Sequence, residues 1–190
     1  LLQLPHFSAP LAKKATDAGI ESVFDLLDME DDERDKLLAM TPAQLADVAR
    51  AANRYPNVDL SYEVEDAEEI AAGETVTVLV QLQREADDAE AKVPAVHAPR
   101  FPKQKEEGWW LVVGDPKANA LLCIKRITLQ QKAKVKLDFT APDAGEYNYT
   151  LFLMCDSYLG CDQEYELKLN VGEAEEGEGE RELLLLGEAV

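Results

Sequence analysis

Apolar and polar residues alternate with helical spacing through the first quarter of the chain. Pro10 lies near the start of a first helix, and Gly19 supplies the left-handed residue that ends it. Two further short helices are predicted at residues 23–27 and 30–38. The third begins with a run of acids, which the positive N-terminal end of a helix stabilises.

A fourth helix carries the clearest start signal. Thr41 is the expected N-cap, Pro42 the first-turn proline and Gln44 the return partner of a capping box. An apolar stripe follows, and the helix is expected to end near Asn53. Four short helices give only a small core, so we expect this part to lean on its neighbour.

From Val58 the spacing of apolar residues changes from 3.6 to 2, which is typical of strands. The same alternation returns at residues 75–82, 133–139 and 165–171. Seven strands are predicted, at residues 58–65, 75–82, 109–113, 121–126, 133–139, 147–155 and 165–171.

Residues 143–149 contain an Asp-x-Gly-x-Tyr run, which opens strand F of an immunoglobulin-like sandwich. The Tyr147 hydroxyl is expected to bond to upstream backbone. Tyr149 stands where an antibody-type domain has a cysteine, so the inter-sheet disulfide is absent, and Trp109 is the expected tryptophan over the core. The fold class is therefore α+β, a small helical (helix-loop-helix) domain followed by a seven-stranded immunoglobulin-like β-sandwich.

These patterns divide the chain into a helical domain at 1–56, a sandwich at 57–172 and an acidic tail at 173–190. The connection at 85–108 is long and proline-containing, which indicates a recognition loop or partial disorder. The tail ends in an apolar run, Leu183–Leu186, for which a solvated end and an apolar anchor both remain open.

The formal charge of −19 argues against a non-specific nucleic-acid binder. The charge is uneven, because residues 59–90 hold eleven acids and only Arg84, whereas residues 100–136 hold nine lysines and arginines against three acids. The absence of a signal peptide and of a long apolar run favours a soluble intracellular protein without membrane contact. A start at Leu1 suggests a piece of a longer chain.

Known catalytic motifs are missing from the sequence, including the phosphate-binding loop, the dinucleotide fingerprint, GxSxG and HExxH. His6 and His97 have no nucleophile nearby in sequence. The cysteines at 123, 155 and 161 fit neither zinc-ligand nor redox spacing, so we expect reduced thiols. We therefore predict no enzyme, no catalytic residue, no cofactor and no metal.

A basic stripe is predicted on one outward strand face. It comprises Lys132, Lys134 and Lys136, with Lys125 and Arg126 one strand earlier. In such sandwiches the strand at 133–139 pairs with the strand at 75–82, and the strand at 58–65, with Glu63 and Glu65, lies beyond it. Cross-strand pairing would therefore explain the lysines. Contact with RNA or an acidic protein surface is the alternative.

The turn between the last two strands is a second candidate surface. Gly160 permits a positive φ, and Asp156 and Asp162 can accept backbone hydrogen bonds. With Tyr158 and Gln163, the turn is either a self-bonded structural turn or a preformed recognition loop.

The start of the chain, residues 4–7 and 19–27, is similar to helix-hairpin-helix units that hold a nucleic-acid backbone. His6 replaces the usual glycine, and acids surround it, so a structural use is favoured.

Together, residues 107–110, 129–139 and 156–163 resemble the Sec sixty-three homology unit, with Trp109 and Trp110 in the first of these segments. That unit occurs in a translocation factor of the endoplasmic reticulum and in large DExH-box RNA helicases. Three segments are closer to the spliceosomal, tandem-cassette helicases: residues 21–34, the strand at 128–139, and Glu164 with Tyr165 after the turn.

The resemblance implies a non-catalytic protein-interaction and regulatory module of a nuclear helicase that acts in pre-mRNA splicing and small nuclear RNA unwinding. The partners it implies are other spliceosomal proteins and the helicase body, with weak RNA contact possible. An RNA-contacting module and the homologous unit of the translocation factor are the alternatives.

Overall fold

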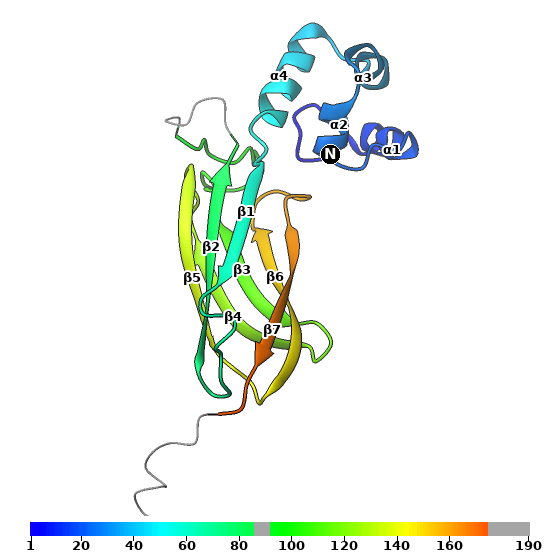
Figure 1. Cartoon of the computed structure of the whole chain (residues 1–190). Helices are drawn as coiled ribbons and strands as arrows, with labels where there is room; N and C mark the ends of the chain where they lie inside the picture. Colours follow the sequence, from blue (N-terminus) through cyan, green and yellow to red (C-terminus); the bar gives the residue numbers. More distant parts are fainter. Residues whose placement is uncertain (86–91, 175–190) are drawn as a thin grey trace, which may run out of the picture.

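A computed structural model describes residues 1–85 and 92–174. In these residues four helices precede seven strands, and the helices sit at one end of an elongated sandwich (Figure 1). The α+β class and the immunoglobulin-like sandwich are therefore confirmed. The Leu183–Leu186 run and most of the predicted tail lie outside the described residues.

The helices begin and end close to the predicted positions. They are α1 (Ala9–Asp17), α2 (Val23–Asp28), α3 (Asp31–Leu38) and α4 (Pro42–Ala52). Thr41 and Gln44 form the predicted capping box on α4, and Ser22 and Asp25 form another on α2. Gly19 follows α1 with φ +86°, as expected for the residue that ends that helix.

The strands form two antiparallel sheets. They are β1 (Val58–Val64), β2 (Thr75–Arg84), β3 (Trp109–Asp115), β4 (Ala120–Ile127), β5 (Lys132–Thr140), β6 (Gly145–Cys155) and β7 (Gln163–Val171). One sheet has the order β1-β2-β5 and the other β4-β3-β6-β7. This division, with β4 added at the edge beside β3, is that of a fibronectin-like sandwich.

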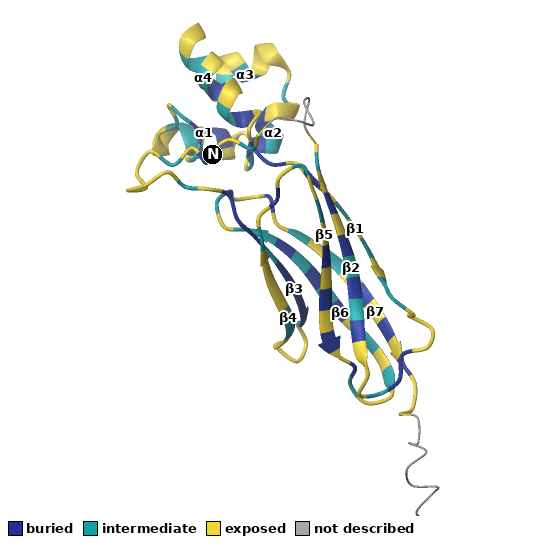
Figure 2. Ribbon diagram, turned by 90° about the vertical axis from the view of Figure 1, so that its left-hand side faces the viewer, coloured by how far each residue is buried: buried dark blue, intermediate teal, exposed yellow. Residues whose placement is uncertain are grey.

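The sandwich core follows the period-2 pattern of the sequence. Buried and exposed residues alternate along β2 and β5 (Figure 2). Trp109 is fully buried, and Tyr149 is 4% exposed. The Tyr147 hydroxyl donates to the Asp143 carbonyl at 2.9 Å, so the predicted tyrosine corner is confirmed.

The helices and the sandwich share one hydrophobic cluster. Tyr55, just after α4, lies with its ring centroid 4.7 Å from that of Tyr158 in the β6–β7 turn. The Tyr55 hydroxyl donates to Gln3 Oε1 at 3.0 Å, and Gln3 Nε2 donates to the Ser157 carbonyl at 2.5 Å. The small helical part therefore does lean on the sandwich, as its short helices predict.

Part of the long connection before β3 is packed against the sandwich. Val96 is 8% exposed and belongs to the core cluster, and its N–H donates to the Lys105 carbonyl at 2.9 Å. Residues 86–91 of the same connection lie outside the described residues.

Candidate interaction surface

The three lysines of β5 lie exposed on the outer face of the three-stranded sheet, as predicted. Lys136 Nζ lies 3.0 Å from a carboxylate oxygen of Glu65, which follows β1 on the far side of β2. Cross-strand pairing therefore accounts for Lys136. Within the described residues Lys132 and Lys134 make no ion pair, and they stand opposite Gln83 and Gln81.

Lys125 and Arg126 of β4 point in different directions. Lys125 Nζ donates to the Lys136 carbonyl at 3.2 Å, which brings the β4 and β5 lysines to one edge of the sandwich. Arg126 instead lies 2.6 Å from an Asp156 carboxylate oxygen, with its guanidinium carbon 5.0 Å from the centre of the Trp110 ring. Arg126 thus belongs with Asp156 rather than with the lysine stripe.

Asp156 is the centre of a polar network at the top of the four-stranded sheet. Its carboxylate accepts hydrogen bonds from the Gly108 N–H and Lys105 Nζ, both at 3.0 Å, and from the Ser157 hydroxyl at 2.5 Å. Partial burial by itself would raise the pKa of Asp156, but the bonds from Ser157, Lys105 and Gly108 outweigh it and lower that pKa to about 2. The role of Lys105 was not foreseen from the sequence, because 51 residues separate the partners.

We expect Asp156→Asn to lower the free energy of unfolding at pH 7 by about 1–2 kcal/mol, since charge-assisted bonds to a partly exposed group are lost. The pKa of Asp156 is depressed in the folded state, so its contribution is complete above the ordinary value of 3.8 and is lost as pH falls towards about 2. Urea unfolding at pH 7, 4 and 2.5 should show the difference between the two proteins shrinking. The exposed Glu164, changed to glutamine, is the control; an equally large effect there would contradict the assignment.

The rest of the turn is held by its own residues. The Cys155 N–H donates to Asp162 Oδ1 at 2.8 Å, and Gly160 has φ +85°, as the self-bonded interpretation requires. Leu159 at the tip is 85% exposed.

Two residues predicted for the surface of this turn face inward instead. Tyr158 is 6% exposed because its ring packs on Tyr55, and burial raises the pKa of its hydroxyl to about 12. The side chain of Gln163 donates to the Val58 carbonyl at 2.7 Å and accepts from the Tyr165 hydroxyl at 2.7 Å. Tyr158 is therefore not exposed as predicted, and Gln163 is half-buried with its side chain engaged; these contacts hold the turn against the helices and β1.

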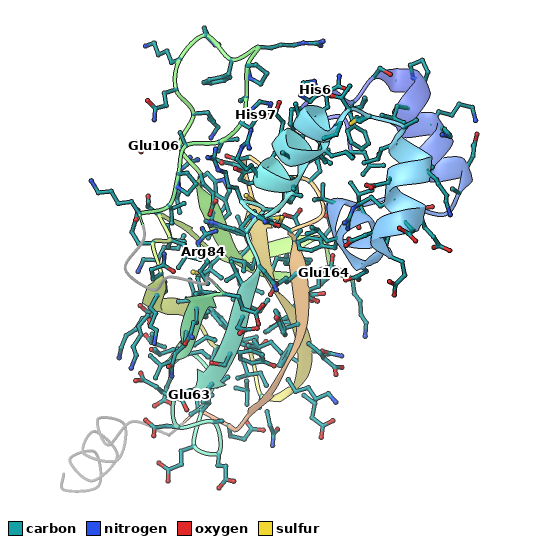
Figure 3. The ribbon with its side chains drawn as sticks, turned by 90° about the horizontal axis from the view of Figure 1, so that it is seen from above. His6, Glu63, Arg84, His97, Glu106 and Glu164 are labelled. Carbon is teal, nitrogen blue, oxygen red and sulfur yellow. The ribbon has the colours of Figure 1, made fainter. Side chains whose placement is uncertain are left out.

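A buried ion pair lies below the same end of the sandwich. Arg84, at the end of β2, pairs with Glu107, and their side chains are 8% and 3% exposed. Figure 3 looks onto this end and labels Arg84. Glu107 also accepts a hydrogen bond from the indole N–H of Trp109 at 2.5 Å, and Arg84 Nε donates to the Gln130 carbonyl at 3.2 Å. The sequence marked Arg84 only as a lone cation in an acidic stretch.

Two residues with catalytic potential, His6 and Cys161, are engaged or unreactive. His6 lies 2.8 Å from Asp47, and the hydrogen bond from His6 lowers the pKa of that carboxylate. His6 also has φ +64°, at the position where the similar nucleic-acid-binding units have glycine. Burial raises the pKa of Cys161 to about 12, and all three cysteines are free thiols. This pattern supports a structural use of the first turn.

In residues 1–85 and 92–174, no group of histidine, cysteine and acidic side chains is placed to hold a metal ion. In the same residues, the helices are too short or too polar to cross a bilayer.

The chain is similar to segments of much longer proteins. It is 58% identical over 175 residues to the U5 small nuclear ribonucleoprotein 200 kDa helicase of Homo sapiens, covering 92% of this chain and 8% of that protein. It is 57% identical over 175 residues to the DExH-box ATP-dependent RNA helicase DExH12 of Arabidopsis thaliana, covering 90% and 8%. It is 41% identical over 172 residues to the activating signal cointegrator 1 complex subunit 3-like protein of Dictyostelium discoideum, covering 87% and 8%.

The family comparison covers both structural parts. The Sec63 Brl domain matches residues 11–168, from within α1 to within β7. This range includes the paired tryptophans and the β6–β7 turn, on which the resemblance in the sequence was based. The chain belongs to the Sec63 Brl domain family.

Proposed function

We propose that this chain is a non-catalytic protein-interaction and regulatory module of a spliceosomal RNA helicase, which serves pre-mRNA splicing and small nuclear RNA unwinding in the nucleus. The observation that carries the proposal is 58% identity across 92% of the chain to a U5 small nuclear ribonucleoprotein helicase. Because the chain spans only 8% of that relative, the ATP-driven work would belong to other parts of the parent protein.

The mechanism we propose is geometric. A rigid sandwich presents its exposed edges and turns to other spliceosomal proteins, while the helical part connects it to the helicase body. The contacts of Tyr55 and Gln3 with the β6–β7 turn support this, because they fix the sandwich to the helices without a flexible joint. The engaged His6 and the high thiol pKa of Cys161 support a role without catalysis.

RNA contact is the second candidate, and Lys125, Lys132 and Lys134 are the residues that favour it. Two findings weigh against it: Arg126 is neutralised by Asp156, and Lys136 by Glu65. The endoplasmic reticulum translocation factor is the third, and 45–58% identity to U5 helicases from Caenorhabditis elegans and Homo sapiens favours the helicase.

The test is a pull-down from nuclear extract with the wild-type chain and with Lys132→Glu/Lys134→Glu/Lys136→Glu. We expect spliceosomal proteins to be captured, to survive ribonuclease, and to fall at least threefold with the variant. Lys13→Glu/Lys36→Glu/Lys168→Glu changes the charge equally at exposed positions elsewhere and should capture as the wild type does. Capture that ribonuclease abolishes would favour the RNA alternative.

A further inference from the structure

The outer face of the four-stranded sheet is apolar along three of its strands. Trp109, Leu111 and Val113 point into the core, so their neighbours in β3 point outward. Register places the outward residues of β4 and β6 beside them. We call this set the outer apolar face: Trp110, Val112, Leu121, Ile124, Phe152 and Met154. Arg126, the register partner of Trp110, lies on the same side of the sheet with its guanidinium over the Trp110 ring.

This face is unusual because outward sheet faces are normally polar. Leu121 and Ile124 are 61% and 51% exposed, and β4 is largely exposed in Figure 2. In the described part of the chain, the outer apolar face makes no packing contact with the core cluster. The outer face of the other sheet carries Ser61, Gln81 and Lys134 at comparable positions, so the apolar character is specific to one face.

β4 is an edge strand of the four-stranded sheet. In the described residues β4 pairs only with β3, and its other side has no backbone hydrogen bond to another element. The pairing is regular over residues 123–127, beyond the irregularity at Val113 and Gly114. An edge of this length can accept an added strand.

The charges at this edge decide which strand it can accept. Lys125 is paired with the inward Leu111, so it lies on the β5 side of the strand, opposite the outer apolar face. The Lys136 carbonyl to which Lys125 donates belongs to β5, the strand that also carries Lys132 and Lys134, and these two lysines make no ion pair within the described residues. A second copy of the chain would bring Lys125 against its equivalent, which like charges disfavour. A phosphate group could pair with the lysines, but it would leave the outer apolar face uncovered.

Resting on the proposed role as an interaction module, we propose that the free edge of β4 binds an extended acidic segment of another protein by strand addition. Alternate apolar side chains of that segment cover Leu121 and Ile124, while the acidic residues between them face Lys125, Lys132 and Lys134. The backbone bonds provide affinity, and the apolar and basic sides provide the sequence preference.

The probe is a random 16-residue peptide library panned against the full 190-residue chain, followed by titration of selected peptides. We expect peptides with apolar residues at every second position and acids between them. Leu121→Glu/Ile124→Glu should weaken binding at least tenfold and Lys125→Glu about threefold. Ser61→Glu/Gln81→Glu adds the same charges to the other sheet's outer face and should leave affinity unchanged. Hydrogen exchange at amides 123–127 should slow when peptide binds.

Other occupants give different results, and each would overturn the proposal. A second copy of the chain would give a dimer in sedimentation that Leu121→Glu/Ile124→Glu abolishes. An RNA would give tighter binding of a 16-nucleotide RNA than of the peptides, abolished by Lys125→Glu. The chain's own apolar run would give a tenfold gain in peptide affinity when Leu183–Leu186 are changed to serine. Selected peptides without acids, or unchanged affinity in Leu121→Glu/Ile124→Glu, would also overturn it. If that variant still captures spliceosomal proteins from nuclear extract, the inference fails while the proposed function stands.

Discussion

Replacing Glu107 with alanine is expected to lower the free energy of unfolding by about 3–5 kcal/mol, the usual cost of leaving one charge of a buried pair without its partner. The Arg84 guanidinium would stay at 8% exposure with its carboxylate removed, and the indole N–H of Trp109 would lose its acceptor. Both losses occur beside the core tryptophan. Urea unfolding followed by tryptophan fluorescence measures the change.

The matched control is the double variant Arg84→Met/Glu107→Met, in which both charges are removed together. We expect it to be markedly more stable than Glu107→Ala, because well-packed apolar side chains can replace a buried pair at little cost. Equal losses in the two variants would show that packing volume, and not the unpaired charge, sets the stability of this region.

The Arg84–Glu107 ion pair is a feature that the sequence alone could not predict. Alternation of apolar residues predicted β1, β2, β5 and β7, because a strand with one buried face must repeat every second residue. Capping residues likewise marked α4, since the cap is a local interaction. Arg84 and Glu107 are 23 residues apart, and neither has a local pattern that reveals its partner.

The candidate interaction surface was also predictable only where it depends on local sequence. The outward position of Lys132, Lys134 and Lys136 follows from strand period alone. The inward rotation of Tyr158 does not, because it depends on Tyr55, which lies in a different part of the fold. The exposure of Leu121 and Ile124 could not be predicted from the sequence, since an apolar residue carries no sign of the face it occupies.

Tyr55→Ala is expected to separate the unfolding of the helices from that of the sandwich. Tyr55 is 9% exposed, contacts the rings of Phe24 and Tyr158, and donates to Gln3. Truncating a buried aromatic side chain costs about 3–5 kcal/mol. Here most of that loss should fall on the helices, because their small core depends on this contact.

Hydrogen exchange with mass spectrometry measures the two parts separately. We expect amides of α1 to α4 to lose protection by about a hundredfold or more, while β2, β3 and β6 change little. Tyr62→Ala is the control, because Tyr62 packs on Tyr165 within the sandwich and should not affect the helices selectively. Equal loss of protection in both parts would mean that they unfold as one unit regardless of Tyr55. Selective loss would show that one aromatic contact transmits the position of the sandwich to the helices, which the proposed regulatory role requires.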